Sequence, residues 1–157
     1  MTAEQVPGEI RTVLIPMHDT TLLLPNAAVA EVIDYRLPKN INGSPDWLSG
    51  SVSWRQISLP VIVMENMLGH QVDKPGVRQR IAVCHAQIPG ARFPYIGIVA
   101  QGIPRLVRLS ENLIELVEAA ENDGEVPVYG KVLVDGEAAW IPDLKKVEVL
   151  LNEALQA

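Results

Sequence analysis

The sequence predicts an all-β protein with minor α content, built as two small β-barrels packed together. Apolar runs of about four to eight residues, bounded by Gly, Pro, Asn and Asp, recur along most of the chain, and such runs are typical of strands. Hydrophobic residues make up 48% of the 157 residues but aromatic ones only 4%, so the core must be aliphatic. Many short strands at hairpin spacing favour small barrels over a helical fold.

The expected strands follow one another along the whole chain. Asp135–Gly136 lies between two alternating runs and suits a two-residue type I′ turn. Residues 36–45 hold two Pro, a Gly and two Asn, which favour a surface loop. The strands that we expect span residues 11–17, 21–25, 51–56, 57–63, 80–88, 95–101, 103–109, 128–134 and 137–142.

Helix signals are fewer. Residues 26–35 either begin with a helical turn capped by their first residue or run on as a strand. Residues 64–69 indicate a short helix that ends at a glycine, and residues 110–120 indicate a modest amphipathic helix with glutamates on one face. Asp143 caps a terminal helix over residues 144–155, whose apolar stripe is Leu144, Val147, Leu151 and Leu155.

Charge and composition disfavour two classes of partner. The formal net charge is −6, which opposes a sequence-independent grip on nucleic acid or on an anionic membrane. The N-terminal segment MTAEQVPGEIR lacks the basic start and apolar core of a signal peptide, and no segment approaches the roughly 18 apolar residues of a membrane span. We therefore expect a cytoplasmic protein without direct membrane insertion and without nucleic acid as a partner.

The sequence also offers no motif for catalysis, a metal or a cofactor. No P-loop or GxGxxG pattern occurs, and His18, His70 and His85 lie far apart without a metal-ligand spacing. Cys84, the only cysteine, stands beside His85, but neighbours in a strand point to opposite faces, so the pair cannot act together. A core thiol is the favoured interpretation, and we expect no enzyme activity and no cofactor.

A set of loose motifs in a specific order resembles a known family. Val29 and Glu31 supply a V-x-E segment that a proline-bearing loop follows, and Gly50, Arg55 and Pro60 fit the spacing G-x-x-N-L-R-G-x-x-x-P. From about residue 10 to about residue 150 the chain resembles the CheW-like domain, the adaptor module of bacterial chemosensory arrays. The segments YIGIVAQGIPRLVRL and GKVLVDGEAAWIPDLKKV resemble its later strands and the start of its last helix.

The resemblance implies a fold, a function and a site. The fold would be one domain over residues 10–157, with two intertwined five-stranded SH3-like barrels, short helices, a C-terminal helix and a connector near 70–79. The function would be that of a non-catalytic adaptor, recruited to receptor arrays, that couples the cytoplasmic tip of a methyl-accepting chemoreceptor to the regulatory domain of a CheA-type histidine kinase. The receptor- or kinase-binding residues would be Val29, Glu31, Gly50 and Arg55.

The chain departs from the family pattern at several motif positions. Gln56 replaces the second glycine of the motif, where a positive φ is costly for a side chain. Val63 and Gln101 replace aspartates. These departures suggest an altered choice of partner, as in an accessory adaptor of a type IV pilus or twitching system.

Alternatives remain open for the function and for the site. A small barrel that binds a small ligand or an oligonucleotide is the other function class, although no aromatic stacking row supports it. Arg55 either contacts a partner, together with Val29 and Glu31 on one surface, or forms an intramolecular pair with Glu31 or Asp34. We expect Trp54 and Trp140 in the core, with Trp54 on the strand face opposite Arg55, and Trp47 in the exposed loop.

Overall fold

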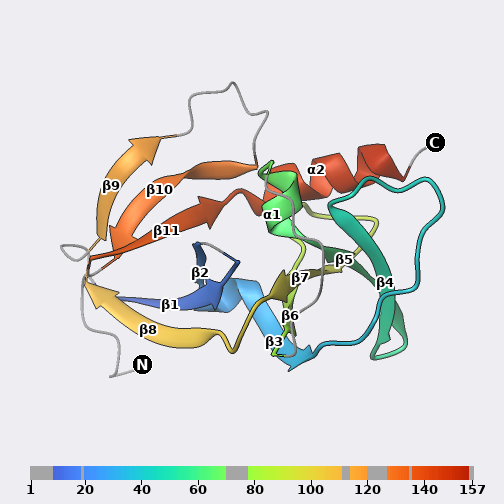
Figure 1. The fold of residues 1–157 in the computed structure, drawn as a ribbon, viewed down its shortest axis with the longest axis horizontal. Helices are drawn as coiled ribbons and strands as arrows, with labels where there is room; N and C mark the ends of the chain where they lie inside the picture. Colours follow the sequence, from blue (N-terminus) through green and yellow to red (C-terminus); the bar gives the residue numbers. More distant parts are fainter. Residues whose placement is uncertain are drawn as a thin grey trace.

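Two β-sheets and two α-helices make up the part of the chain that the computed structural model describes, residues 9–18, 20–69, 78–110, 114–119, 127–134 and 136–155 (Figure 1). The six-stranded sheet has the order β8-β1-β2-β11-β10-β9 and the five-stranded sheet the order β3-β6-β7-β5-β4. The first sheet contains β1 (Glu9–Pro16), β2 (Thr21–Pro25), β8 (Arg105–Ser110), β9 (Ile114–Ala119), β10 (Val128–Val134) and β11 (Glu137–Pro142). The second contains β3 (Val29–Asp34), β4 (Leu48–Trp54), β5 (Ile57–Ile62), β6 (Arg80–His85) and β7 (Tyr95–Ala100).

The two sheets are intertwined along the chain. The chain begins in the six-stranded sheet, builds the whole five-stranded sheet and then returns to the first through β8. The 3₁₀ helix η1 (Asn26–Ala28) leads into β3. Residues 26–35, for which the sequence allowed either a helical turn or a strand, therefore form a helical turn followed by a strand. The Asn26 side chain does not cap the helical turn. The predicted connector near 70–79 lies mostly outside the described residues, and the strands on its two sides, β5 and β6, share one sheet.

Three apolar clusters form the core, and each has a definite place in the fold. The shared core combines side chains of both sheets and of α2 (Leu144–Ala154), among them Ile15, Leu22, Cys84, Ile98 and Leu151. The five-stranded core contains Val52, Trp54, Leu59, Val61, Ile81, Val83 and Val99. The six-stranded core contains Leu14, Leu23, Leu109, Val132, Val134 and Ala139. Alternate residues of β6 enter different clusters, so this strand is apolar on both faces.

The terminal helix is fixed by its cap and by a buried glutamate. The Asp143 side chain accepts a hydrogen bond from the backbone N–H of Lys146 at 3.2 Å, as an N-cap should. The buried carboxylate of Glu148 accepts hydrogen bonds from the backbone N–H groups of Gln87 and Ile88 at 2.7 and 3.3 Å, which ties the loop after β6 to the helix. The predicted stripe is confirmed, with three residues buried and the last partly buried: Leu144, Val147, Leu151 and Leu155.

The helix predicted over residues 110–120 is wrong, because residues 114–119 form strand β9. This strand pairs with β10 in antiparallel register, with Val132 opposite Leu116 and Val134 opposite Ile114. A helix of that length needs an apolar face against a core, but Leu116 and Val117 are both exposed. Ladder hydrogen bonds to β10 therefore decide the conformation, and the sheet gains a sixth strand that the expected five did not include.

The remaining predictions of local structure have mixed outcomes. The short helix α1 (Met64–Met67) ends just before Gly69, at φ +92°, as predicted. Trp54 is buried and Trp140 packs against the shared core, as predicted. The prediction of an exposed Trp47 is wrong, because its ring packs on the shared core and its carbonyl accepts a hydrogen bond from Val63 N–H at 2.8 Å. Neither α1 nor α2 is long and apolar enough to cross a membrane, and no other helix in the described residues is.

Candidate functional site

The candidate site is built around the tight turn that joins β4 to β5. Trp54 pairs with Ile57 across the hairpin, which leaves Arg55 and Gln56 as the two turn residues. Both have positive φ, 48° and 65°, as a type I′ turn requires. Glycine or asparagine normally fills such positions, and the left-handed conformation costs other residues roughly 1–2 kcal/mol each. The turn geometry is kept although Gln56 replaces the motif's glycine.

Arg55 makes two contacts with groups of its own chain. Its Nη2 donates a hydrogen bond to Oε1 of Glu31 at 2.8 Å, in an ion pair whose side chains are 66% and 38% exposed. Its guanidinium also lies over the Trp54 ring, 4.6 Å from the centroid, a cation–π geometry. The prediction that Trp54 and Arg55 face opposite ways is wrong, because Arg55 belongs to the turn and not to the strand. Of the two intramolecular partners considered, Glu31 is the one found.

This ion pair joins the two edges of the five-stranded sheet. Glu31 lies on β3 and Arg55 follows β4, and these strands stand at opposite ends of the sheet order. The loop after β3 reinforces the closure, because Lys39 and Ser51 exchange two backbone hydrogen bonds of 2.8 and 3.0 Å. The sheet is thereby closed at both a side-chain and a backbone contact.

Gly50 is the residue that lets this loop approach β4. It is buried at φ +141°, and a Cβ at this position would overlap the carbonyl oxygen of Lys39 and lie 3.0 Å from Cβ of Pro38. Only glycine fits this position, because it has no Cβ to clash with the loop and it can adopt a positive φ without strain. Gly50 therefore positions the loop beside the site and offers no surface of its own.

Val29 does not lie on the same strand face as Glu31, contrary to the prediction. Val29 pairs with Cys84 and Glu31 pairs with Val83, so a bulge inserts one extra residue between them. Cys84 belongs to the shared core and Val83 to the five-stranded core, which places the two β3 side chains on opposite faces. Val29 packs against the shared core, half-buried. Alternation in the sequence could not reveal this bulge.

Aromatic side chains extend the site across the sheet. The rings of Trp54 and Tyr95 meet edge to face, with centroids 4.8 Å apart, and the centroids of the Tyr95 and His85 rings are 5.2 Å apart. Together with Glu31 and Arg55, these side chains form a continuous set of contacts, which we call the charged–aromatic row. Sequence reasoning missed Tyr95 and His85. The signal that could have found them is their position at the ends of two adjacent strands, where they pair directly.

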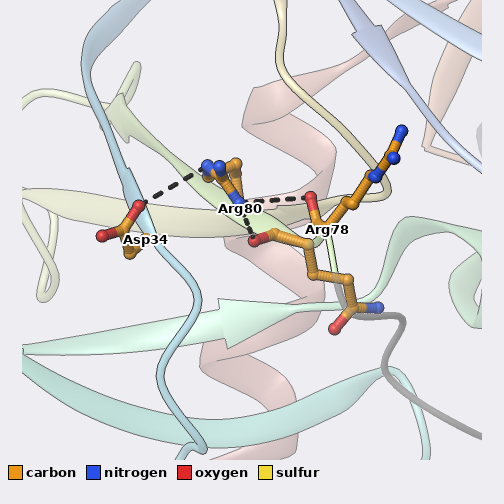
Figure 2. Close-up of polar contacts among 4 residues, drawn as sticks. Asp34, Arg78 and Arg80 are labelled. Atoms are coloured by element: carbon orange, nitrogen blue, oxygen red, sulfur yellow. Dashed lines mark hydrogen bonds and ion pairs between the residues drawn. The ribbon is translucent and has the colours of Figure 1, made fainter.

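The other end of β3 carries a second ion pair, which is purely local. Asp34 and Arg80 are paired residues of β3 and β6, with Oδ1 and Nε 3.5 Å apart. Figure 2 shows Arg80 between Asp34 and the carbonyl of Arg78, while the Arg78 side chain points away. Arg80 Nη1 also donates to the carbonyls of Arg78 and Gln79 at 3.3 and 3.0 Å. This contact fastens the start of β6.

Gln101 occupies the position of a family aspartate, and its surroundings explain the change. Its amide Nε2 donates to Oε2 of Glu65 at 3.3 Å, and its Oε1 accepts from Gln79 Nε2 at 3.2 Å. Glu65 is buried, and its Oε2 also accepts from His18 N–H at 2.9 Å. An aspartate at position 101 would place a second carboxylate beside the first, and like charges disfavour each other there. The amide instead supplies a donor.

The residues considered for nucleophilic chemistry lie apart. Cys84 is fully buried, and this burial raises the pKa of its thiol to about 12. His85 is exposed on the other face of β6 and contacts Tyr95. Among the residues that the structure describes, no group of three or more His, Cys, Asp and Glu side chains could hold a metal ion.

Comparisons with known proteins agree with this fold. The family model of the CheW-like domain matches residues 11–149. The fold is similar to that of the crystal structure of the scaffolding protein TtCheW from Thermoanaerobacter tengcongensis, with a TM-score of 0.70, 19% identity, and coverage of 85% of this chain and 88% of that chain. A search of curated proteins gave no match. Since the family model covers most of its length, this chain belongs to the CheW-like family.

Proposed function

We propose that this protein is a non-catalytic adaptor of a chemosensory system, which couples the cytoplasmic tip of a chemoreceptor to the regulatory domain of a CheA-type histidine kinase. Membership of the CheW-like family supports the general role. The observation that carries the proposal is the ion pair of Arg55 with Glu31, both at motif positions and both reachable by solvent. A cytoplasmic location at receptor arrays follows from the same role.

The energetics of the turn favour a role in binding over a role in stability. A solvent-exposed ion pair contributes about 0–1 kcal/mol, whereas positive φ at Arg55 and Gln56 opposes folding by a similar or larger amount. The turn nevertheless holds the arginine over Trp54, where its planar fork is fixed before any partner arrives. Pre-ordered arginines beside aromatic rings are typical of residues that dominate interface energy.

Charge reversal tests the proposal. Arg55→Glu should weaken binding to a purified receptor cytoplasmic fragment or kinase regulatory domain about 30-fold or more, the effect of a hot spot. The doubly exchanged variant, Glu31→Arg with Arg55→Glu, keeps an ion pair and should melt like the parent, yet it should still bind poorly. Arg80→Glu is the matched control at the local pair and should bind normally. Parent-like binding of Arg55→Glu to both partners would contradict the proposal.

The departures from the family pattern support a finer assignment, to an accessory adaptor of a type IV pilus or twitching system. Gln56, Val63 and Gln101 alter three motif positions, and Gln101 is engaged with the buried Glu65 and is not free for a partner. Deletion of the gene should reduce twitching and leave flagellar swimming unchanged. A swimming defect with normal twitching would contradict this assignment.

A further inference from the structure

A basic pocket lies on the six-stranded sheet, apart from the charged–aromatic row. It is an open hollow of about 220 Å³ between β1, β8 and η1. Arg11 and Arg108 are directly paired across the two strands, so their side chains stand on the same face. The lining residues are Arg11, Thr12, Asn26, Leu106, Val107 and Arg108.

The two arginines have few partners among the residues that the structure describes. Arg108 has an ion pair with Glu9 at 3.8 Å, beyond hydrogen-bond distance. Within the described residues, Arg11 and the Asn26 side chain have neither an ion pair nor a hydrogen bond. Like charges directly opposite each other on a sheet are destabilising, and an anion between them would relieve that repulsion. The protein as a whole is acidic, at −6, so this local cationic pair stands out as a place for a negative group.

An apolar side chain accompanies the charges, and so does a strand edge that is unpaired among the described residues. Leu106 is 75% exposed and lies two residues before Arg108, on the same face of β8. β8 is the first strand in its sheet order, with β1 as its only strand neighbour among the described residues, and Figure 1 shows it at the border of the sheet. An unpaired edge is a template for an added strand. Thr12 is already engaged, because its Oγ1 donates to the Val107 carbonyl at 2.9 Å.

We propose that this pocket binds an extended acidic segment of a partner protein, which adds as a strand beside β8. A carboxylate of the segment pairs with Arg108 and Arg11, while an apolar side chain two residues away packs on Leu106. Charge-assisted hydrogen bonds supply the selectivity for acid, and backbone pairing supplies the orientation. The site is separate from Arg55 and does not depend on the adaptor proposal.

The test titrates the full chain with acetyl-Thr-Glu-Thr-Leu-Thr-amide and with its Gln analogue, followed by NMR at the Arg Nε–H and β8 backbone amide signals. With the Glu peptide we expect saturable chemical-shift changes and slowed hydrogen exchange of the β8 amides. The Gln peptide should bind at least about ten-fold more weakly. Arg108→Gln and Arg11→Gln should cause a similar loss. Arg36→Gln, an exposed arginine elsewhere, and Arg55→Glu should bind the Glu peptide like the parent.

Three outcomes would overturn the proposal. Equal binding of the Glu and Gln peptides would show that β8 pairs with the peptide backbone without selecting for a negative charge. Unchanged binding by Arg11→Gln and Arg108→Gln would place the peptide elsewhere. Inorganic phosphate or acetate that saturates the arginine signals as readily as the peptide, with no protection of β8 amides, would define a site for small free anions and not for a protein segment.

Discussion

The two sheets of this protein treat their edges in opposite ways. The five-stranded sheet joins its edge strands through the Glu31–Arg55 ion pair and covers one edge with the loop that Gly50 admits. The six-stranded sheet ends in β8 and β9, which expose Leu106, Leu116 and Val117. Edge strands normally carry devices against further pairing. The recognition groups that we propose for the closed sheet therefore lie on a turn, whereas those that we propose for the open sheet lie along a strand.

This difference corresponds to the location of the site residues that the resemblance supplied. The V-x-E and G-x-x-x-x-R positions all belong to strands, turns or contacts that close the five-stranded sheet. The six-stranded sheet shares its core with the other sheet through α2, yet its edges hold none of the site residues that the resemblance supplied. These motif residues therefore help to close the sheet, and substitutions can separate this structural role from the binding role that we propose.

The largest expected loss of stability is that of a substitution in the core that the two sheets share. Leu151 of α2 is buried there, so Leu151→Ala should lower the free energy of unfolding by about 2–5 kcal/mol. Val149 lies on the exposed side of the same helix, and Val149→Ala is the control that should cost far less. Urea denaturation followed by tryptophan fluorescence measures both. A loss below about 1 kcal/mol for Leu151→Ala, within the range of surface substitutions, would mean that α2 does not hold the sheets together.

The next effect should come from the loop that covers the edge of the closed sheet. Gly50→Ala should lower the free energy of unfolding by about 1–3 kcal/mol, because a Cβ overlaps the Lys39 carbonyl and φ is +141°. Gly43, in the same loop at φ +78°, has no atom within 4 Å of its Cβ position, so Gly43→Ala isolates the φ penalty alone. Thermal melting compares the two. Equal losses would show that the close approach at Gly50 contributes nothing beyond φ.

Much of the fold could be predicted from the sequence, and the failures have physical reasons. Period-two apolar runs and the Asp143 cap correctly predicted most strands and the terminal helix. Residues 114–119 were missed because pairing with β10 outweighs a glutamate pattern of helical period. Trp47 was misplaced because its loop folds back on the shared core, a contact that no local pattern encodes.

The candidate site was predicted in part. The proximity of Glu31 and Arg55 was predicted, as one surface on the basis of the resemblance or alternatively as an intramolecular pair. Neither periodicity nor propensity could have linked residues on opposite edges of a sheet. The bulge between Val29 and Glu31 defeated the face assignment, because it shifts the register by one residue without a Gly or Pro to mark it. Tyr95 and His85 joined the charged–aromatic row only through cross-strand pairing.

A substitution in the β4–β5 turn should have a smaller effect on the free energy of unfolding, and in the opposite direction. Gln56→Gly should raise the free energy of unfolding by about 1 kcal/mol, because glycine adopts φ +65° without the steric cost that glutamine bears. Gln56→Ala, which retains a Cβ, should give no such gain. Chemical denaturation measures both variants. If Gln56→Gly is no more stable than Gln56→Ala, the turn does not strain residue 56, and the energetic case for a binding role of Arg55 loses one support.

The smallest expected effect on stability is the difference in coupling energy between the two ion pairs of β3. A double-mutant cycle on Glu31 and Arg55 should give a coupling of at most about 1 kcal/mol, since both side chains are partly exposed. The cycle on Asp34 and Arg80 should give less, because its atoms are 3.5 Å apart and Asp34 is 94% exposed.

Alanine substitutions at the four positions, melted in low salt and in about 1 M salt, supply the cycles. Salt should reduce the Glu31–Arg55 coupling but leave the part that comes from the ordered turn, in which Arg55 also contacts Trp54. A larger coupling for Asp34–Arg80 would contradict the view that Glu31–Arg55 closes the sheet. Because even the expected coupling is small, a large loss of partner binding by Arg55→Glu could not be explained by instability, and the arginine would then act at an interface.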